Sequence, residues 1–404
     1  MPITGDRGRQ AVAAAYGAFV LIGVFAGIGG VILPAQMADY GVDRTKIGIT
    51  FFVFSAGFFL AGSTAGALVQ RFGTRVTLVG GTALFTAMSL YTAVRPPFLA
   101  LLLLQAPLGY GIGILESVFN AYVAQLPRAS NRVNRLHAFF GVGALLGPLL
   151  AAWMLRSWAW TSVYLVVTVL LVPLVVFVLL VFPKPGVAVA ETVHRGLLTD
   201  TVRERAVLLG ALFLAVYVGL EISVGDWGFS LLVDGRGQSQ LLAGYAVSGY
   251  WLGLTVGRFV ISPAASRIGL GEVAMTFGCL FGIVAATCLV WSASQPALAD
   301  GGFALLGFFL GPIFPTTMAV TPRLTHERLV PTAIGFINGI SVVGGCVLPW
   351  LAGTITQAEG VSTLVPFCVV LAALLVLIWW RLARHVPEVR DVPSVLDFSG
   401  QTGS

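Results

Sequence analysis

The sequence predicts an all-α membrane protein with twelve transmembrane helices in two pseudo-symmetric six-helix bundles. The composition indicates a membrane protein, because the 404 residues are 57% hydrophobic and only 10% charged, whereas about a quarter of the residues of an average soluble protein are charged. The number of long apolar segments gives the number of helices. A similarity between the two halves of the chain predicts their grouping into two bundles.

Each of the twelve apolar runs is long enough to cross a hydrocarbon core about 30 Å thick. Glycine, proline or polar residues mark the breaks between them. The first run is too long for the core of a signal peptide, so we expect it to remain as the first helix. The runs cover residues 11–33, 47–70, 76–94, 98–126, 136–157, 159–182, 206–233, 239–265, 272–293, 298–321, 332–357 and 362–384.

These runs divide the chain into two halves of six helices. We expect an N-terminal bundle over residues 1–182, a polar cytoplasmic linker over 183–205, a C-terminal bundle over 206–384 and a cytoplasmic tail over 385–404. If both termini are cytoplasmic, that side receives 17 of the 23 basic residues and the outer loops receive five. The positive-inside rule then predicts a multi-pass protein of the plasma or inner membrane with both termini in the cytoplasm.

Two short matches indicate that the halves are copies of one another. RFG at 71–73 corresponds to RIG at 267–269 with an offset of 196, and GFFL at 57–60 corresponds to GYWL at 249–252 with an offset of 192. The difference between the offsets suggests a short insertion. Two repeats of this kind predict a central cleft that opens to either side of the membrane in turn.

Glu116 is an acid inside an otherwise apolar helix. On a helix advancing 100° per residue, Gln105, Gly109, Glu116 and Asn120 fall within one narrow sector. A charged carboxylate at the centre of a lipid-facing helix costs at least about 2.5–3.5 kcal/mol, so this stripe should face a cavity or a partner. Glu116 is therefore a candidate proton-coupling group. The alternative is a protonated Glu116 that only holds helices together.

A second acid, Glu221, lies near the midplane of the seventh helix, with Tyr217 on the same face. A carboxylate beside an aromatic ring suits a solute with hydroxyl groups. The alternative is a structural ion pair with Arg258 of the eighth helix, and Arg258 could also reach Glu116. Asp226 lies nearer the outer surface and is a candidate gate residue or a solvated vestibule residue.

Several further side chains are candidates for the cleft. His137 could relay protons because a histidine titrates near neutral pH, or it could anchor a loop. The predicted proton-coupling residues are Glu116 and Glu221, and the predicted substrate-binding residues are Gln105, Asn120, Tyr217, Glu221, Trp227, Trp251 and Asn338.

Five segments of the chain resemble the fucose–proton symporter family of the major facilitator superfamily. They are GILESVFN at Gly113–Asn120, YVGLEISVG at Tyr217–Gly225, GYWLGLTVGR at Gly249–Arg258, FPT at Phe314–Thr316 and VGGCVLPWLAG at Val343–Gly353. The resemblance implies the major facilitator fold, alternating access and functional roles for Glu116 and Asn120. Separately from the resemblance, the candidates for ion pairs or gating are Arg258, Asp226 and the loop arginines Arg71, Arg75 and Arg267.

The chain departs from that family at three places. Gly30 stands where the family symporter has a helix 1 Asp, and Gln70 stands where the superfamily loop motif usually has an Asp. GALLGP at Gly143–Pro148 is similar to part of an antiporter motif, but Ala151 and Ala152 replace its glycine pair. Gly30 removes one of the two titrating acids of the family. The partial antiporter motif leaves export as an alternative direction of transport.

The favoured function is therefore secondary active transport of a small polar solute, of a sugar or sugar-like kind, driven by protons or by sodium. The alternatives are a proton-coupled exporter of drugs or metabolites, an uncoupled facilitator, and a receptor or membrane enzyme. No GxxxxGK motif, catalytic constellation or metal-ligand cluster occurs in the sequence, so we expect no enzyme activity, cofactor or metal. We also expect a monomer that does not bind nucleic acid.

Overall fold

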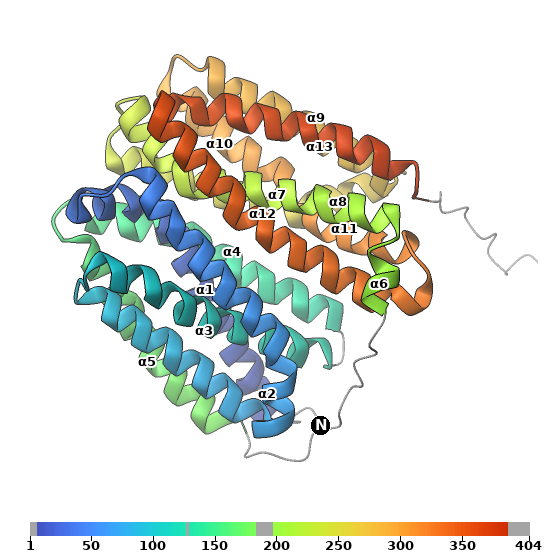
Figure 1. Ribbon diagram of the computed structural model, residues 1–404, viewed down its shortest axis with the longest axis horizontal. Helices are drawn as coiled ribbons and strands as arrows, with labels where there is room; N and C mark the ends of the chain where they lie inside the picture. The colour runs from blue at the N-terminus through green and yellow to red at the C-terminus, as the bar shows by residue number, and fades with distance from the viewer. Residues whose placement is uncertain (1–5, 127–128, 183–196, 387–404) are drawn as a thin grey trace, which may run out of the picture.

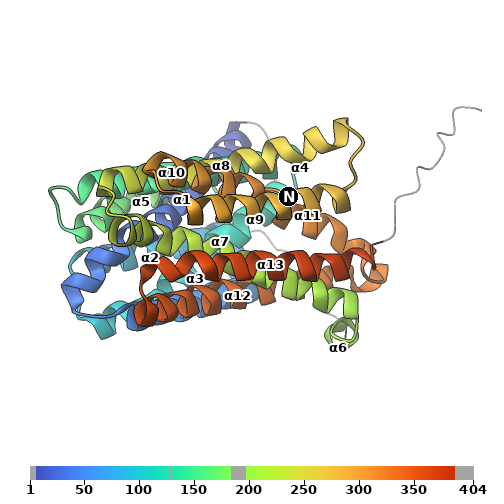
Figure 2. The ribbon, with the colours of Figure 1, turned by 90° about the horizontal axis from the view of Figure 1, so that it is seen from above.

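The computed structural model describes residues 6–126, 129–182 and 197–386, and this part of the chain is almost entirely helical, with no strand. Residues 387–404 of the predicted tail and most of the predicted linker lie outside the described residues. The long helices run along one common direction (Figures 1 and 2). They are α1 Asp6–Tyr40, α2 Arg44–Ala93, α3 Phe98–Ala124, α4 Ala129–Met154, α5 Trp160–Val181, α7 Arg205–Ser230, α8 Gln240–Arg267, α9 Glu272–Ser292, α10 Pro296–Leu310, α11 Ile313–Val320, α12 Val330–Glu359 and α13 Leu364–Ala383.

The remaining helices are short. The helix α6 Leu197–Thr201 precedes α7, and a π-helical turn, η1 Leu231–Gly235, continues α7 at its end. Three 3₁₀ turns connect the later helices: η2 Thr321–Arg323, η3 Glu327–Leu329 and η4 Val361–Thr363. The start of α1, the short helix α6 and the end of α13 lie at the same end of the molecule (Figures 1 and 2). We call this end the terminal side and the other end the opposite side.

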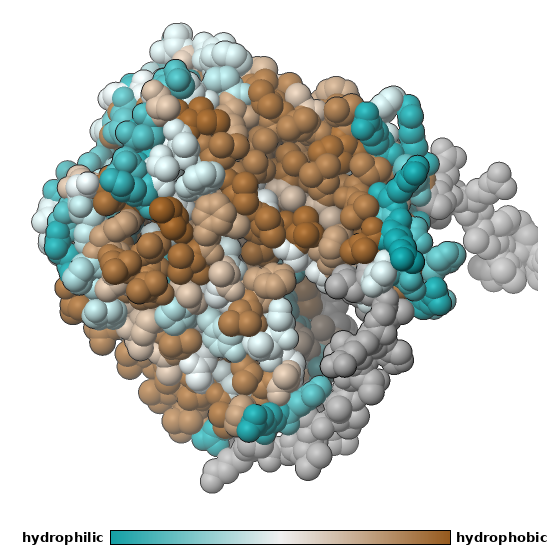
Figure 3. Space-filling view, in the orientation of Figure 1, coloured by the Kyte–Doolittle hydropathy of each residue, from teal (hydrophilic) through white to brown (hydrophobic). Residues whose placement is uncertain are grey.

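The described helices make the twelve predicted crossings. The 50-residue α2 crosses twice, because Gly73 interrupts it with φ +81°, a backbone conformation that favours glycine. Helices α10 and α11 together make one crossing, broken at Gly311 and Pro312. Ten helical segments are long and apolar enough to span a bilayer. Helix α8 is not one of these ten, because its sequence is more polar. Figure 3 shows apolar residues over the middle of the molecule and polar residues at both ends.

Glycine contacts show that the two halves repeat one packing arrangement. An added Cβ at Gly57 of α2 would lie 1.9 Å from the carbonyl oxygen of Ala106 in α3, and one at Gly253 of α8 would lie 2.1 Å from that of Ala304 in α10. Gly57 and Gly253 are 196 residues apart, the offset of the RFG and RIG loops. The structure therefore supports an offset of 196 for this helix. The offset of 192 from GFFL and GYWL is wrong by one helical turn.

The two halves meet mainly through the helix pairs α1 with α7, α2 with α12 and α4 with α8. Small residues allow the close approach. An added Cβ at Gly30 would lie 2.2 Å from the carbonyl oxygen of Gly225, and one at Gly244 would lie 2.4 Å from the Cβ of Ala152. Both contacts belong to the half of the molecule nearer the opposite side. The two bundles are therefore closed against each other on that side.

Candidate transport site and gate

A break in the tenth crossing organises the polar residues of the C-terminal half. Pro315 has no backbone N–H, so the carbonyl group four residues earlier, at Gly311, lacks its helical donor. Arg258 supplies a substitute, because its Nε donates to the Gly311 carbonyl oxygen at 3.3 Å. The Tyr217 hydroxyl donates to the neighbouring Leu310 carbonyl oxygen at 3.0 Å. The broken helix thus holds a guanidinium and a phenol in fixed positions inside the membrane.

Glu221 joins these two residues in what we call the charged cluster, which consists of Tyr217, Glu221 and Arg258. Arg258 interacts electrostatically with Glu221, and the Tyr217 side chain interacts with both. Tyr250 of α8 donates from its hydroxyl to the backbone carbonyl oxygen of Glu221 at 2.9 Å. Of the two acids that Arg258 could reach, the structure therefore places it with Glu221.

Glu116 lies on α3, in the N-terminal half, and its side chain is partly exposed. Within the described residues its carboxylate has no cationic partner, since burial is the only influence on its charge. The Asn120 side chain donates to the Glu116 backbone carbonyl oxygen at 3.0 Å. Gln105, which sequence reasoning placed on the same stripe, is buried and donates to Leu101 of its own helix at 3.3 Å. The accessible part of the stripe is therefore Glu116 and Asn120.

His137 connects the two halves near this level. It lies on α4, where it packs edge-on against Phe19 with ring centroids 5.7 Å apart and interacts electrostatically with Arg258 of α8. One turn further along α4, the backbone at Gly141 contacts Thr255 of α8. His137 is therefore not a loop anchor at the membrane surface. It faces the guanidinium of the charged cluster across the interface between the halves.

Several of these groups share one depth in the membrane. Counting 1.5 Å per residue from the terminal-side ends of their helices, Glu116, His137 and Asn338 all lie about 12 Å deep. Asn338 is exposed on α12, and Glu116, Asn120, Glu221 and Arg258 are partly exposed. Polar groups that retain access to solvent inside a helical bundle line a water-filled space. Figure 3 shows a recess between the halves toward the terminal side.

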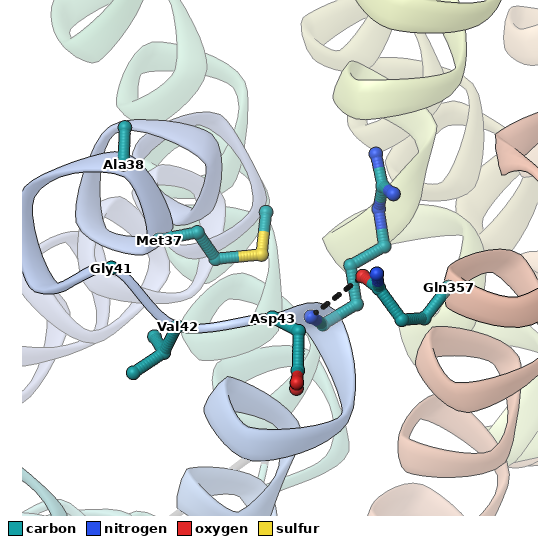
Figure 4. A pocket seen from close by; sticks show the side chains of 7 residues that line it. Met37, Ala38, Gly41, Val42, Asp43 and Gln357 are labelled. Carbon is teal, nitrogen blue, oxygen red and sulfur yellow. Dashed lines mark hydrogen bonds between the residues drawn. The ribbon is translucent and has the colours of Figure 1, made fainter.

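On the opposite side, polar contacts close the space between the halves. The Arg44 guanidinium, at the start of α2, forms a salt bridge of 3.0 Å with Asp234 of η1. The Arg44 backbone N–H donates to the Gln357 side-chain oxygen of α12 at 3.1 Å. This bond is the dashed line in Figure 4, beside a surface pocket of about 400 Å³ lined by Met37, Val42 and Asp43 among others. Neither Arg44, Asp234 nor Gln357 was a candidate from the sequence.

An aromatic layer lies beneath these polar contacts. Phe51 of α2 packs edge-on against Trp227 of α7 with ring centroids 6.1 Å apart, and Phe52 packs in the same way against Trp350 of α12 at 5.6 Å. Trp227 is fully buried and donates from Nε1 to the Pro349 carbonyl oxygen at 2.8 Å. The expectation that Trp227 lines the cleft therefore does not hold in this conformation. Trp227 belongs to the closed gate.

The other expected ion pairs are absent from the part of the chain that the structure describes. Arg71 and Arg267 are exposed at the terminal side, and Arg71 stacks on Phe72. None of Arg71, Arg75, Arg267 and Asp226 has a salt bridge to another described side chain within 4.0 Å. Ion pairs that hold the terminal side closed cannot form while that side is open. This explains why Arg71, Arg75 and Arg267 have no salt bridge to a described side chain. Asp226 instead lies against α1.

Apart from their charge, nothing in the sequence indicated that these residues form a gate. Arg44 counted only as one of the basic residues of an outer loop, and Asp234 followed the last apolar residue of its span. Their contact joins residues 190 positions apart. Trp251, which the sequence did indicate as a candidate, is buried and its ring packs over Gly225. Its indole N–H has no hydrogen-bond partner among the described residues.

Comparison with known proteins agrees with this architecture. The model of the Major Facilitator Superfamily matches residues 14–233 and 229–398, one match for each half of the chain. The chain belongs to the major facilitator superfamily. It is a membrane transporter and not an enzyme, and the twelve crossings in two repeated bundles are the fold that the sequence predicted.

Superfamily members with sequence similarity include a yeast protein and a bacterial sugar transporter. The chain is 25% identical to Bypass of stop codon protein 6 of Saccharomyces cerevisiae, over 89% of this chain and 80% of that protein. It is 27% identical to the glucose/galactose transporter of Brucella abortus, over 85% of this chain and 87% of that protein.

Two solved superfamily structures show the same fold. A bacterial homologue of the human lysosomal transporter Spinster, inward-facing and occupied, superposes with a TM-score of 0.79 at 12% identity, covering 96% of this chain and all of the other. The E. coli fucose–proton symporter superposes with a TM-score of 0.64 at 16% identity, covering 93% of this chain and 98% of the other.

Proposed function

We propose that this transporter moves a sugar or sugar-like solute together with protons, by alternating access between its two halves. The observation that carries the proposal is that both halves carry partly exposed polar side chains inside the bundle, Glu116 and Asn120 on one half and Glu221 and Arg258 on the other. Hydrogen-bonding amides and carboxylates that converge on a water-accessible space bind polyhydroxylated solutes. The sequence similarity to a glucose/galactose transporter supports a substrate of this class.

The two carboxylates have different surroundings, which suggests different roles. Glu221 has a cation and a phenol beside it, and both favour the ionised form, which accepts hydrogen bonds from a sugar hydroxyl. Glu116 has no counter-charge within the described residues. A carboxylate without a partner is costly to keep ionised when the site closes around it, so binding of a proton relieves that cost. We assign proton coupling to Glu116 and substrate binding to Glu221 and Asn120.

The properties of the gate support a conformational cycle in which the opposite side opens and closes. The conformation described here is closed on the opposite side by backbone contacts, the aromatic layer and the Arg44–Asp234 pair, and it is accessible from the terminal side. The salt bridge is partly exposed, with 18% and 42% of its side chains accessible, so it contributes at most about 1 kcal/mol. A weak latch over a larger apolar contact suits a gate that opens in every cycle.

We also propose that the terminal side is the cytoplasmic side of a plasma or inner membrane. The bias of 17 basic residues against five supports this orientation. A fluorescent protein fused after Ser404 is expected to fluoresce in cells, and alkaline phosphatase fused at the same place is expected to be inactive. Active phosphatase at that position would show that the orientation is reversed.

Binding measurements on the purified protein test the substrate class. In a thermal-shift screen we expect hexoses to stabilise the protein and drug-like organic cations to leave it unchanged. Replacing Asn120 or Glu221 by Ala should weaken binding of the best hexose about tenfold or more, since each removes a hydrogen-bonding group worth about 1.5–3 kcal/mol where a charge is involved. Asn134→Ala, at an exposed polar position on α4, serves as the matched control and should bind as the wild type does.

Stabilisation by organic cations in place of hexoses would contradict the substrate proposal and favour the exporter. Unchanged hexose affinity in both Asn120→Ala and Glu221→Ala would show that the solute contacts other faces of the helices.

A further inference from the structure

Asp226 is a partly exposed acid on α7 that has no role in the proposed transport cycle. It lies on α7 about 14 Å from the opposite-side end of η1, counting 1.5 Å per residue. Its neighbour Trp227 belongs to the aromatic layer of the gate. No hydrogen bond or ion pair joins the Asp226 carboxylate to another described residue.

The contact between α1 and α7 determines the space around Asp226. A Cβ added at Gly29 would lie 3.5 Å from the Asp226 Oδ1 atom, so the carboxylate rests against the bare backbone of α1. At Gly30 an added Cβ would lie 2.8 Å from the Asp226 Cα atom and 2.2 Å from the Gly225 carbonyl oxygen. The two backbones therefore touch. A side chain at position 30, and with it any counter-charge from that turn of α1, has no space.

The other helix that approaches Asp226 offers no cation either. Tyr250 of α8 is the titratable group that interacts electrostatically with Asp226, and its hydroxyl already donates to the Glu221 backbone. Glu221 lies more than one turn away on α7 and interacts with Arg258 instead. Trp251 of α8 packs over Gly225 but carries no charge. On α1 and α8, the groups described next to Asp226 or its neighbour Gly225 are thus two glycines, a phenol and an indole, and none of them is a cation.

From this geometry we infer that Asp226 is a proton-binding site that must be occupied for the opposite side to close. Closing brings Gly29 and Gly30 onto the carboxylate and removes its water. Burial of an unpaired charge is far more costly than burial of the neutral acid, so closure and proton binding are coupled. When the halves separate on the opposite side, α1 moves off α7 and the carboxylate becomes accessible to protons from that side.

This inference deepens the proposed proton-coupled transport and rests on it for its place in the cycle. Asp226 would bind a proton from the opposite side before closure. In the conformation described here its side chain retains partial exposure, and in the proposed cycle the proton is released after the opposite side has closed. Because the site sits on the contact between the halves, it acts on the conformational change itself, whereas Glu116 on α3 lies away from the α1–α7 contact.

The test measures the distance between the halves without any substrate. Spin labels at Lys46→Cys and Glu359→Cys, both exposed on the opposite side and one on each half, report opening of that side in a protein whose four cysteines have been replaced. In the wild type we expect acidic pH to favour the short distance. Each proton taken up on closure changes the ratio of closed to open protein about tenfold per pH unit across the titration of the acid.

Asp226→Asn should remove this proton and hold the protein in the short-distance state at alkaline pH as well. Asp226→Glu keeps a carboxyl group and should restore the pH response with a displaced midpoint. Glu327→Gln, the matched control, removes an exposed acid of η3 that lies outside the proposed transport site, and it should keep the response of the wild type. A pH response of Asp226→Asn equal to that of the wild type would overturn the inference.

If Asp226→Asn does not fold, Asp226→Glu decides the question, because a midpoint identical to that of the wild type would equally overturn it. Since no sugar is present, failure of the substrate proposal leaves this result untouched. Conversely, a pH-independent distance in a protein that accumulates hexose would remove Asp226 from the coupling and leave the transport function standing.

Discussion

Glu116→Gln is expected to abolish proton-driven accumulation of the transported solute while leaving exchange of that solute across the membrane intact. Glutamine has the shape and neutrality of a protonated glutamate, so the variant behaves as a transporter that has always bound this proton. It can change conformation with solute bound, but it cannot release the proton to return empty. Accumulation ratios in proteoliposomes with an imposed pH gradient should fall from the wild-type value to about one.

Exchange of labelled for unlabelled solute without a gradient is the control for folding and binding. Glu221→Gln is the matched variant, because it removes the other carboxylate of the site, and it should weaken solute binding and exchange together. Wild-type accumulation by Glu116→Gln would exclude Glu116 as the coupling group. Accumulation absent from the wild type itself, with exchange preserved, would indicate an uncoupled facilitator.

Gly30→Ala is expected to prevent closure of the opposite side and to stop transport, although it adds only one methyl group. The added Cβ would lie 2.2 Å from the Gly225 carbonyl oxygen and 2.8 Å from two backbone atoms of Asp226. Backbone atoms cannot move aside without separating α1 from α7. Overpacking of this kind costs about 1–3 kcal/mol, which changes the ratio of closed to open protein by about one to two orders of magnitude.

Two other glycines provide the controls. Gly29→Ala adds its methyl group at an ordinary contact distance of 3.5 Å from the Asp226 Oδ1 atom, so it should transport nearly as the wild type does. Gly57→Ala adds its methyl group 1.9 Å from the Ala106 carbonyl oxygen, within the N-terminal half, so it should reduce the yield of folded protein instead. Initial transport rates, spin-label distances and yield from size exclusion separate the three cases. Equal rates for Gly30→Ala and the wild type would contradict the assignment of this contact.

Local features of the sequence were sufficient to predict the twelve crossings. A run of twenty apolar residues has few stable arrangements in a bilayer other than a helix, so the composition of each segment determines its crossing. The acid Glu116 and the pair Glu221 and Arg258 could be recognised for the same reason, because charge within such a run is costly wherever the helix lies. The loops RFG and RIG gave the correct register of the repeat, since each contains a glycine that needs a positive φ.

Only the tertiary structure decided which of these groups face one another. The sequence left Arg258 free to pair with Glu116 or Glu221, and the break at Gly311 places it with Glu221 by giving its Nε an acceptor. The gate of Arg44, Asp234 and Gln357 joins residues far apart in the chain, and Trp227 belongs to that gate because Pro349 of another helix accepts its N–H. Gly30 appeared in the sequence as a missing acid, whereas in the structure it is the contact that encloses Asp226. Charge and hydropathy are properties of single segments and can be read along the chain, but pairing and enclosure depend on the packing of helices from both halves.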